Sequence, residues 1–167
     1  VHLLVGTTDV TWKDNPKYYN ATVLVDPQGE TAGVYHKQHL VPFGEYVPLR
    51  KLLSFVSPLV DSIGEFSAGE GPVILMMDGQ PIGAIVCYEM IYPGLVREFV
   101  RNGSRLLVTV TNDAWYGRTA APHQHFQQAA MRAIEHGRYV VRAANTGISG
   151  VIDPYGRVLA ETNLFED

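Results

Sequence analysis

Short apolar runs of strand length recur along the whole chain and limit what it can fold into. The longest of them, such as residues 82–88 and 106–110, are well below the roughly 18 apolar residues that a membrane-spanning helix needs. Turn sequences separate several of these runs, namely Asp-Pro-Gln-Gly at 26–29, Asp-Gly-Gln at 78–80 and Asp-Pro-Tyr-Gly at 153–156. The sequence therefore predicts many short strands, several of them joined as hairpins.

Helical spacing appears in a few segments between these strands. Apolar residues recur three and four apart from Leu95 to Val100, and a second helix is expected over residues 122–136, with a proline near its start and Gly137 just past its end. A short amphipathic helix is expected at 49–56. Strands are expected at 1–6, 18–26, 32–37, 73–78, 81–87, 105–111, 139–144, 147–153 and 157–161. This pattern predicts a single strand-rich α/β domain over residues 1–167, with two layers of sheet and helices outside.

Composition narrows the class of protein further. The 167 residues include 13 Lys and Arg against 17 Asp and Glu, a net charge of −4 that argues against a nucleic-acid partner. The single cysteine excludes an internal disulfide framework and a zinc cluster. The chain opens on an apolar run without Met or a signal-type segment, so we expect it to be a piece of a longer protein, incomplete at its N-terminal side.

Cys87 is the first candidate for chemistry. It ends an apolar strand and precedes a helical segment, a position at which backbone N–H groups lower the pKa of a thiol and stabilise an oxyanion. The alternative is that a lone cysteine after Ile85-Val86 is a small, buried core residue.

Lys37 is the second candidate. A lysine beside a thiolate can stabilise a tetrahedral oxyanion, and a carboxylate such as Glu45, at the end of the loop Pro-Phe-Gly-Glu, can hold that lysine in place. The alternative is a solvated lysine at a strand end.

A third segment, Thr-Asn-Asp-Ala-Trp-Tyr-Gly at 111–117, follows a buried strand, where loops commonly line a site. An Asx turn with a packed tryptophan is the alternative there. We interpret the histidines at 36, 39, 123 and 125 as hydrogen-bonding residues, because no third metal ligand stands at a useful spacing. Phosphate-binding and serine-hydrolase motifs are absent from the sequence.

Together these segments resemble the nitrilase superfamily. Lys37 with His39-Leu40 resembles its lysine motif, and Cys87-Tyr88-Glu89 resembles its cysteine motif. The closer resemblance is to the apolipoprotein N-acyltransferase family of bacterial envelopes. It is carried by residues 37–48 (KQHLVPFGEYVP), 111–117 (TNDAWYG), 122–125 (PHQH) and 142–149 (RAANTGIS).

This resemblance implies a nitrilase-type α-β-β-α sandwich and a covalent acyl transfer without a cofactor or a metal. Cys87 would take a fatty acyl group from phosphatidylethanolamine as a thioester and pass it to the N-terminal amine of a diacylglyceryl-cysteine lipoprotein. Lys37 would stabilise the oxyanions, Glu45 would orient Lys37 or the substrate, and Tyr88 and Glu89 would support the cysteine. Trp115 and Asn112 would line the substrate path.

The resemblance also implies a bacterial inner-membrane enzyme whose catalytic domain faces the periplasm and whose membrane segments lie outside this sequence. Its general-base glutamate is expected upstream of Val1, because no carboxylate before Lys37 fits that role. Without that base, we expect the isolated chain to be inactive. Two alternatives remain open, a nitrilase-type amidase or carbamoylase that uses water as the second nucleophile, and a non-catalytic nitrilase-like binding module.

Overall fold

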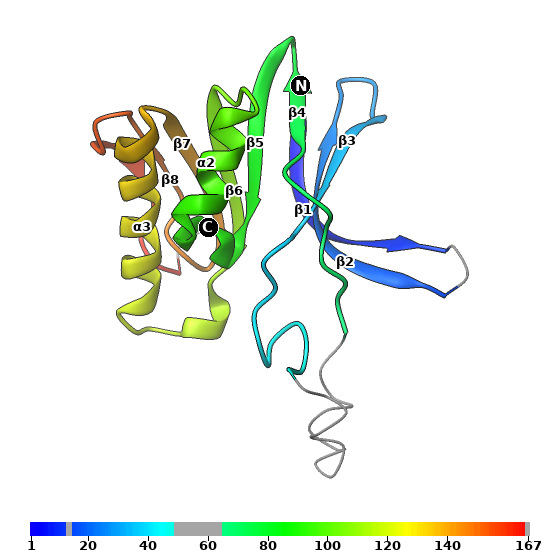
Figure 1. The fold of residues 1–167 in the computed structure, drawn as a ribbon. Helices are drawn as coiled ribbons and strands as arrows, with labels where there is room; N and C mark the ends of the chain where they lie inside the picture. The colour runs from blue at the N-terminus through cyan, green and yellow to red at the C-terminus, as the bar shows by residue number, and fades with distance from the viewer. Residues whose placement is uncertain (13–14, 49–64, 166–167) are drawn as a thin grey trace.

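The computed structural model describes residues 1–12, 15–48 and 65–165, which form two β-sheets and the helices that cover one of them (Figure 1). The smaller sheet is antiparallel, with strands β1 (Leu3–Thr11), β2 (Lys17–Val25) and β3 (Thr31–His36) in that order. The larger sheet has the order β4 (Ile74–Met77), β5 (Gln80–Val86), β6 (Leu106–Asn112), β7 (Tyr139–Asn145), β8 (Gly150–Ile152) and β9 (Val158–Glu161). The helical elements are η2 (Cys87–Ile91), α2 (Pro93–Arg101), η3 (Ala114–Tyr116) and α3 (Ala121–His136).

The centre of the larger sheet determines where a site can lie. Strands β5, β6 and β7 are parallel, whereas β4, β8 and β9 pair antiparallel at the two edges. Helix α2 connects β5 to β6, and α3 connects β6 to β7, so the carboxyl ends of the three parallel strands lie at one edge. Loops at this edge are the usual place for binding and catalytic residues in α/β folds.

The core joins the two sheets face to face, and α2 and α3 cover the outer face of the larger sheet (Figure 1). Leu24 and Tyr35 of the smaller sheet are fully buried in the same cluster as Leu75 and Ile85 of the larger one. Phe99 of α2 is buried in that cluster as well, which closes the layer beyond the larger sheet. The predicted arrangement of two sheets with helices outside is confirmed.

Three local features differ from the sequence expectations. Cys87 does not end β5 but begins η2, because its backbone turns to a positive φ of 52°. The strand expected at 147–153 begins at Gly150, since residues 146–149 form a loop held by a hydrogen bond from Arg142 Nε to the carbonyl of Ile148. β1 continues to Thr11 because it pairs with β2 along its whole length. The helix expected at 49–56 lies outside the described residues.

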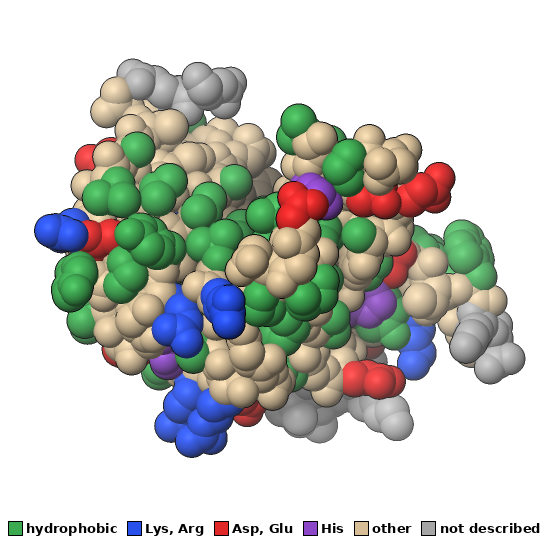
Figure 2. Space-filling view, turned by 90° about the horizontal axis from the view of Figure 1, so that it is seen from above, with side chains coloured by type: hydrophobic (Ala, Val, Ile, Leu, Met, Phe, Trp, Pro, Cys, Tyr) green, Lys and Arg blue, Asp and Glu red, His purple; other side chains and the backbone are tan. Residues whose placement is uncertain are grey.

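Apolar side chains are spread over the face of the molecule seen in Figure 2, between scattered charged groups. This surface agrees with the charged fraction of 18%, which is below the roughly 25% of an ordinary soluble domain. Within the part of the chain that the structure describes, no helix has the length and hydropathy needed to cross a bilayer.

Candidate active site

Cys87 lies at the carboxyl end of β5 in a strained backbone conformation. Its φ of 52° is left-handed, a region that non-glycine residues rarely adopt and that costs about 1–3 kcal/mol. The residue is partly exposed rather than enclosed in the core, and it lines a pocket. The structure therefore favours the first interpretation of this cysteine, a thiol presented at a turn, over that of a fully buried core residue.

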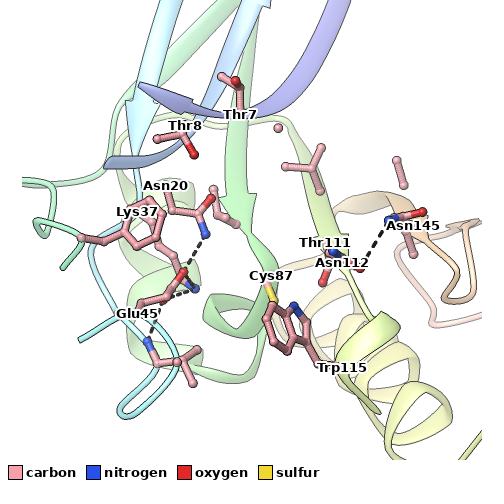
Figure 3. A pocket seen from close by; sticks show the side chains of 18 of the residues that line it. Thr7, Thr8, Asn20, Lys37, Glu45, Cys87, Thr111, Asn112, Trp115 and Asn145 are labelled. Carbon is pink, nitrogen blue, oxygen red and sulfur yellow. Dashed lines mark hydrogen bonds and ion pairs between the residues drawn. The ribbon is translucent and has the colours of Figure 1, made fainter. Parts of the chain in front are cut away.

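Lys37 and Glu45 form an ion pair on the other side of the same pocket (Figure 3). Lys37 follows β3, its side chain is 1% exposed, and Nζ donates to Glu45 Oε2 at 2.7 Å and to Oε1 at 2.9 Å. The Val41 amide donates to Oε2 at 2.7 Å and Asn20 Nδ2 donates to Oε1 at 2.6 Å. The interpretation of Lys37 as a solvated lysine is therefore wrong, because a buried ammonium needs the counter-charge that Glu45 supplies.

Glu89 lies outside the pocket, in a fully buried position behind Cys87. Its carboxylate accepts hydrogen bonds from the backbone amides of Val86, Gln38 and His39 and from the Tyr35 hydroxyl. Burial raises the pKa of Glu89, and these donors oppose that change without cancelling it. Glu89 thus ties η2 to the end of β3, which places the cysteine element next to Lys37.

The pocket between these groups has a volume of about 1100 Å³ and lies between the two sheets. Asn112 and Trp115 line it from the loop after β6, and Trp115 is 87% exposed beside Cys87 (Figure 3). Asn145 Nδ2, at the end of β7, donates to Asn112 Oδ1 at 3.4 Å. Most of the remaining wall is apolar, contributed by residues that include Leu4, Val5, Val41, Pro42, Phe43, Phe66, Val86, Val110 and Ala143.

The structure thus brings five of the seven predicted residues to one pocket: Cys87, Lys37, Glu45, Asn112 and Trp115. Tyr88 and Glu89 do not line it. Tyr88 instead lines a smaller pocket of about 330 Å³. Its ring also meets the ring of Tyr92 edge-on.

Sequence reasoning missed several lining residues. Asn20 lies in the middle of β2, where nothing in the sequence marks it, and only the fold brings it to Glu45. Tyr116 lies in the predicted loop 111–117 but was not singled out. Burial, together with the nearby charges of Cys87 and Asp113, raises the pKa of Tyr116 to about 12, so its hydroxyl keeps its proton.

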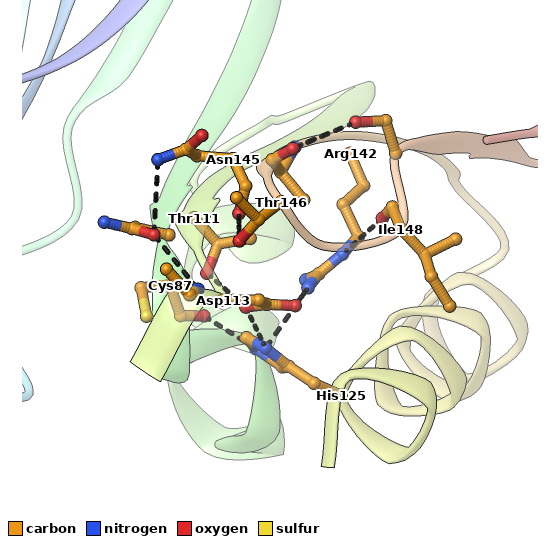
Figure 4. Close-up of polar contacts among 12 residues, drawn as sticks. Cys87, Thr111, Asp113, His125, Arg142, Asn145, Thr146 and Ile148 are labelled. Atoms are coloured by element: carbon orange, nitrogen blue, oxygen red, sulfur yellow. Dashed lines mark hydrogen bonds and ion pairs between the residues drawn. The ribbon is translucent and has the colours of Figure 1, made fainter. Parts of the chain in front are cut away.

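A second missed feature is a buried polar network directly behind Cys87 (Figure 4). His125 of α3 contacts both the Cys87 carbonyl and Asp113, and Arg142 of β7 donates to Asp113 Oδ2 at 2.6 Å. The prediction that His125 is a hydrogen-bonding residue is confirmed, whereas its partners come from three distant segments and no local pattern indicates them. Among the described residues, no group of His, Cys, Asp and Glu has the arrangement of a metal site.

The arrangement supplies the parts of covalent catalysis. A thiol at a strained turn could act as a nucleophile, an ammonium held by a carboxylate lies across the pocket, and an apolar wall keeps electrostatic attraction strong. A substrate carbonyl bound between Cys87 and Lys37 would meet the nucleophile on one side and a cation on the other.

Comparison with known proteins identifies the family. The carbon-nitrogen hydrolase family matches residues 1–167, the whole of this sequence. The chain belongs to this family. Solved structures show the same fold: a carbon-nitrogen hydrolase from Helicobacter pylori superimposes with a TM-score of 0.75 at 19% identity, covering 100% of this chain and 59% of that one. A mutant amidase from Nesterenkonia sp. AN1 superimposes with a TM-score of 0.71 at 22% identity, covering 98% and 57%. The expected nitrilase-type fold is confirmed.

Curated relatives with higher identity are apolipoprotein N-acyltransferases. An apolipoprotein N-acyltransferase from Geobacter metallireducens is 50% identical over 151 residues, and one from Methylococcus capsulatus is 45% identical over 168 residues. These alignments cover 90% and 99% of this chain but only 29% and 32% of the relatives, so the chain spans about a third or less of their length. The resemblance to that group, which the motifs at 37–48 and 111–117 indicated, is confirmed.

Proposed function

We propose that this chain carries the nucleophile and the oxyanion-binding lysine of an apolipoprotein N-acyltransferase. The acyl donor is a phospholipid, phosphatidylethanolamine, and the acceptor is the N-terminal amine of a diacylglyceryl-cysteine lipoprotein. One observation carries the proposal: Cys87 and the Lys37–Glu45 pair line one large, mainly apolar pocket in a chain 50% identical to a relative of that name.

The first half-reaction is thioester formation at Cys87. The sulfur attacks the ester carbonyl of the donor, the carbonyl oxygen becomes an oxyanion next to Lys37, and the ester C–O bond then breaks. The leaving alkoxide takes up the proton that the thiol gives up, and it departs as the hydroxyl of a lysophospholipid. In the second half-reaction the lipoprotein amine attacks the thioester, an amide forms, and Cys87 regains a proton that the amine loses.

The other residues have supporting roles in this proposal. Glu45 pairs with the Lys37 ammonium and holds it at the pocket, and Glu89 holds the turn that carries Cys87. Trp115 and Asn112 line the path of the substrate, and Tyr88 supports the cysteine from behind. The pocket volume of about 1100 Å³ is slightly larger than the roughly 300–1,000 Å³ of ordinary small-molecule sites, which suits a long acyl chain.

The setting follows from the substrates. A phospholipid donor and a lipid-anchored acceptor place the reaction at the bacterial inner membrane, with this domain on the periplasmic side. An amidase from Nesterenkonia sp. AN1 shares this fold, so hydrolysis of small amides is the competing activity, and a non-catalytic binding module is the other alternative.

The test is the intact mass of the full-length native polypeptide after incubation with phosphatidylethanolamine. We expect an added acyl mass on Cys87 that hydroxylamine removes, and no addition to a Cys87→Ala variant. Release of ammonia from small amides without an acyl adduct would assign the protein to the amidases. If neither an acyl adduct nor ammonia forms, the result would indicate the non-catalytic binding module.

A further inference from the structure

Behind Cys87 three buried side chains form a network that the proposed reaction does not use (Figure 4). Asp113 follows β6, His125 belongs to α3 and Arg142 belongs to β7. The side chains of Asp113 and Arg142 are 0% exposed and that of His125 is 4% exposed. Their ends converge on the turn that begins η2.

The protonation of His125 Nε2, the atom that contacts Cys87, follows from its hydrogen-bond partner. His125 Nε2 lies 3.2 Å from the Cys87 carbonyl oxygen, and a carbonyl only accepts, so Nε2 carries a hydrogen. Nδ1 lies 3.1 Å from Asp113 Oδ1 and 3.2 Å from Arg142 Nη2. It either accepts from Arg142 as a neutral ring or donates to Asp113 as an imidazolium, and both states leave the bond to Cys87 intact.

The network is itself held rigidly. Arg142 Nη2 donates to Asp113 Oδ2 at 2.6 Å, and Arg142 Nε donates to the Ile148 carbonyl at 3.0 Å. Thr111 Oγ1 donates to Asp113 Oδ1 at 3.0 Å, and the Asp113 amide donates to the Asn145 carbonyl at 3.2 Å. Asp113 is therefore fixed from its own loop, from β7 and from the loop after β7.

The cysteine needs such a support because of its backbone. A non-glycine residue at φ 52° relaxes toward the ordinary regions unless its surroundings hold it, and a rotation of the peptide group after Cys87 would redirect the side chain. Within the described residues, His125 is the side chain that bonds the Cys87 carbonyl (Figure 4), and it does not line the pocket.

We propose that His125 is a positioning residue for Cys87: its Nε2–H holds the Cys87 carbonyl and so keeps the strained turn that directs the sulfur toward Lys37, while Asp113 and Arg142 fix the ring. This inference rests on the proposed function for the identity of the substrate that the sulfur attacks. The orientation of the thiol is a separate property that can be measured without any acyl donor.

The experiment compares two substitutions in the full-length native polypeptide. His125→Phe keeps a ring of similar size and removes the donor, whereas the side-chain amide of His125→Gln reaches about as far as Nε2 and still donates to the carbonyl. We expect His125→Phe to lower kcat on the order of ten- to a hundredfold with KM for phosphatidylethanolamine little changed, because a small displacement of a reacting atom has an effect of this size. His125→Gln restores most of kcat.

A second readout is the rate at which iodoacetamide alkylates Cys87, followed by mass spectrometry of the peptide that contains it. His125→Phe is expected to change this rate several-fold and His125→Gln to leave it close to that of the wild type. Val96→Ala is the matched control, since it removes buried atoms from α2 and does not line the pocket. A general loss of folded protein would lower activity in that control as well.

The results separate the two proposals. A His125→Phe protein that alkylates and turns over like Val96→Ala, or a His125→Gln protein as impaired as His125→Phe, overturns the positioning role. If the wild type forms no acyl adduct, the proposed function fails while the alkylation comparison still decides the role of His125. Should His125→Phe not fold, Asp113→Asn replaces it, because this change keeps the side chain's shape and removes the charge that fixes the ring. If Asp113→Asn then showed the alkylation rate and the kcat of the wild type, the proposed role of the network in positioning Cys87 would be refuted.

Discussion

At the scale of single residues, the most demanding feature is the ammonium of Lys37, which is almost wholly buried and depends on one carboxylate. Glu45→Gln leaves that cation without a full counter-charge and presents an amide N–H₂ to donors from Val41 or Asn20. We expect a loss of about 3 kcal/mol in the free energy of unfolding, together with a strong fall in thioester formation. Urea titration and the acyl-adduct assay measure the two effects. Glu30→Gln, an exposed change in the β2–β3 turn, should alter stability by less than about 0.5 kcal/mol.

The carboxylate of Asp113 predicts how stability depends on pH. Burial alone would raise the pKa of Asp113, but hydrogen bonding to His125 and the charge of Arg142 outweigh it, so the pKa lies below the ordinary 3.8. The unfolded chain then takes up this proton at a higher pH than the folded one, and the stability that Asp113 contributes is present above about pH 4 and lost as the pH falls below it. In urea titrations, the stability difference between the wild type and Asp113→Asn should therefore shrink on acidification. For the non-ionisable variant Val96→Ala the difference should stay constant, and a constant difference for Asp113→Asn would contradict the assignment.

At the scale of secondary-structure elements, the loop at 146–149 fits closely against the network behind the cysteine. A Cβ added to Gly147 would lie 2.6 Å from Asp113 Oδ2 and 2.9 Å from Ala144 Cβ. Gly147→Ala should therefore displace Asp113 and destabilise the protein by about 1–3 kcal/mol, as overpacking does. Gly71→Ala is the matched control, because its added Cβ would meet nothing within 4 Å. Thermal unfolding of both variants measures the difference. Equal melting temperatures would show that the loop at 146–149 accommodates the added methyl group without cost.

Most of the elements themselves were predictable from the sequence. The hairpins at 26–29, 78–80 and 153–156 follow from turn residues whose preference is local, and α3 follows from its proline and Gly137. The shortened β8 and the departure of Cys87 from β5 were not predictable, because both depend on contacts between distant segments. The bond from Arg142 to the Ile148 carbonyl and the bond from His125 to the Cys87 carbonyl have no local signature.

The candidate site divides in the same way. Cys87, Lys37 and Glu45 stand in motifs that a single sequence displays, and the fold brings them to one pocket. Asn20, Asp113 and Arg142 support them through the pairing of strands far apart in the chain. The groups proposed to carry the chemistry, and two that support them, Glu45 and Glu89, are therefore visible in the sequence, whereas the hydrogen bonds that connect the support to the site appear only in the structure.

At the scale of the whole molecule, one hydrogen bond links the two sheets close to the site. The Tyr35 hydroxyl of β3 donates to the carboxylate of Glu89 in η2, the turn that follows β5, with O···O distances of 2.9 and 3.0 Å to its two oxygens. Tyr35→Phe keeps the edge-on packing against Phe99 but removes a donor from a buried carboxylate, so we expect a loss of about 2 kcal/mol. Tyr139→Phe, at the half-exposed start of β7, should change stability by less than about 0.5 kcal/mol. Denaturant titration compares the two, and equal losses would contradict the special role of the link.

The division of the pocket between two sheets has a consequence for how such a protein changes over evolutionary time. The proposed nucleophile directly follows a strand of the larger sheet and its cationic partner directly follows a strand of the smaller one, so their separation depends on how closely the two sheets pack. The rate of turnover therefore depends on the distance between the two sheets. Selection that monitors only the reaction also constrains positions such as Leu24 and Leu75, which are buried between the sheets and never meet a substrate. Variants that slow the reaction are accordingly expected to arise deep in the interior as well as around the pocket.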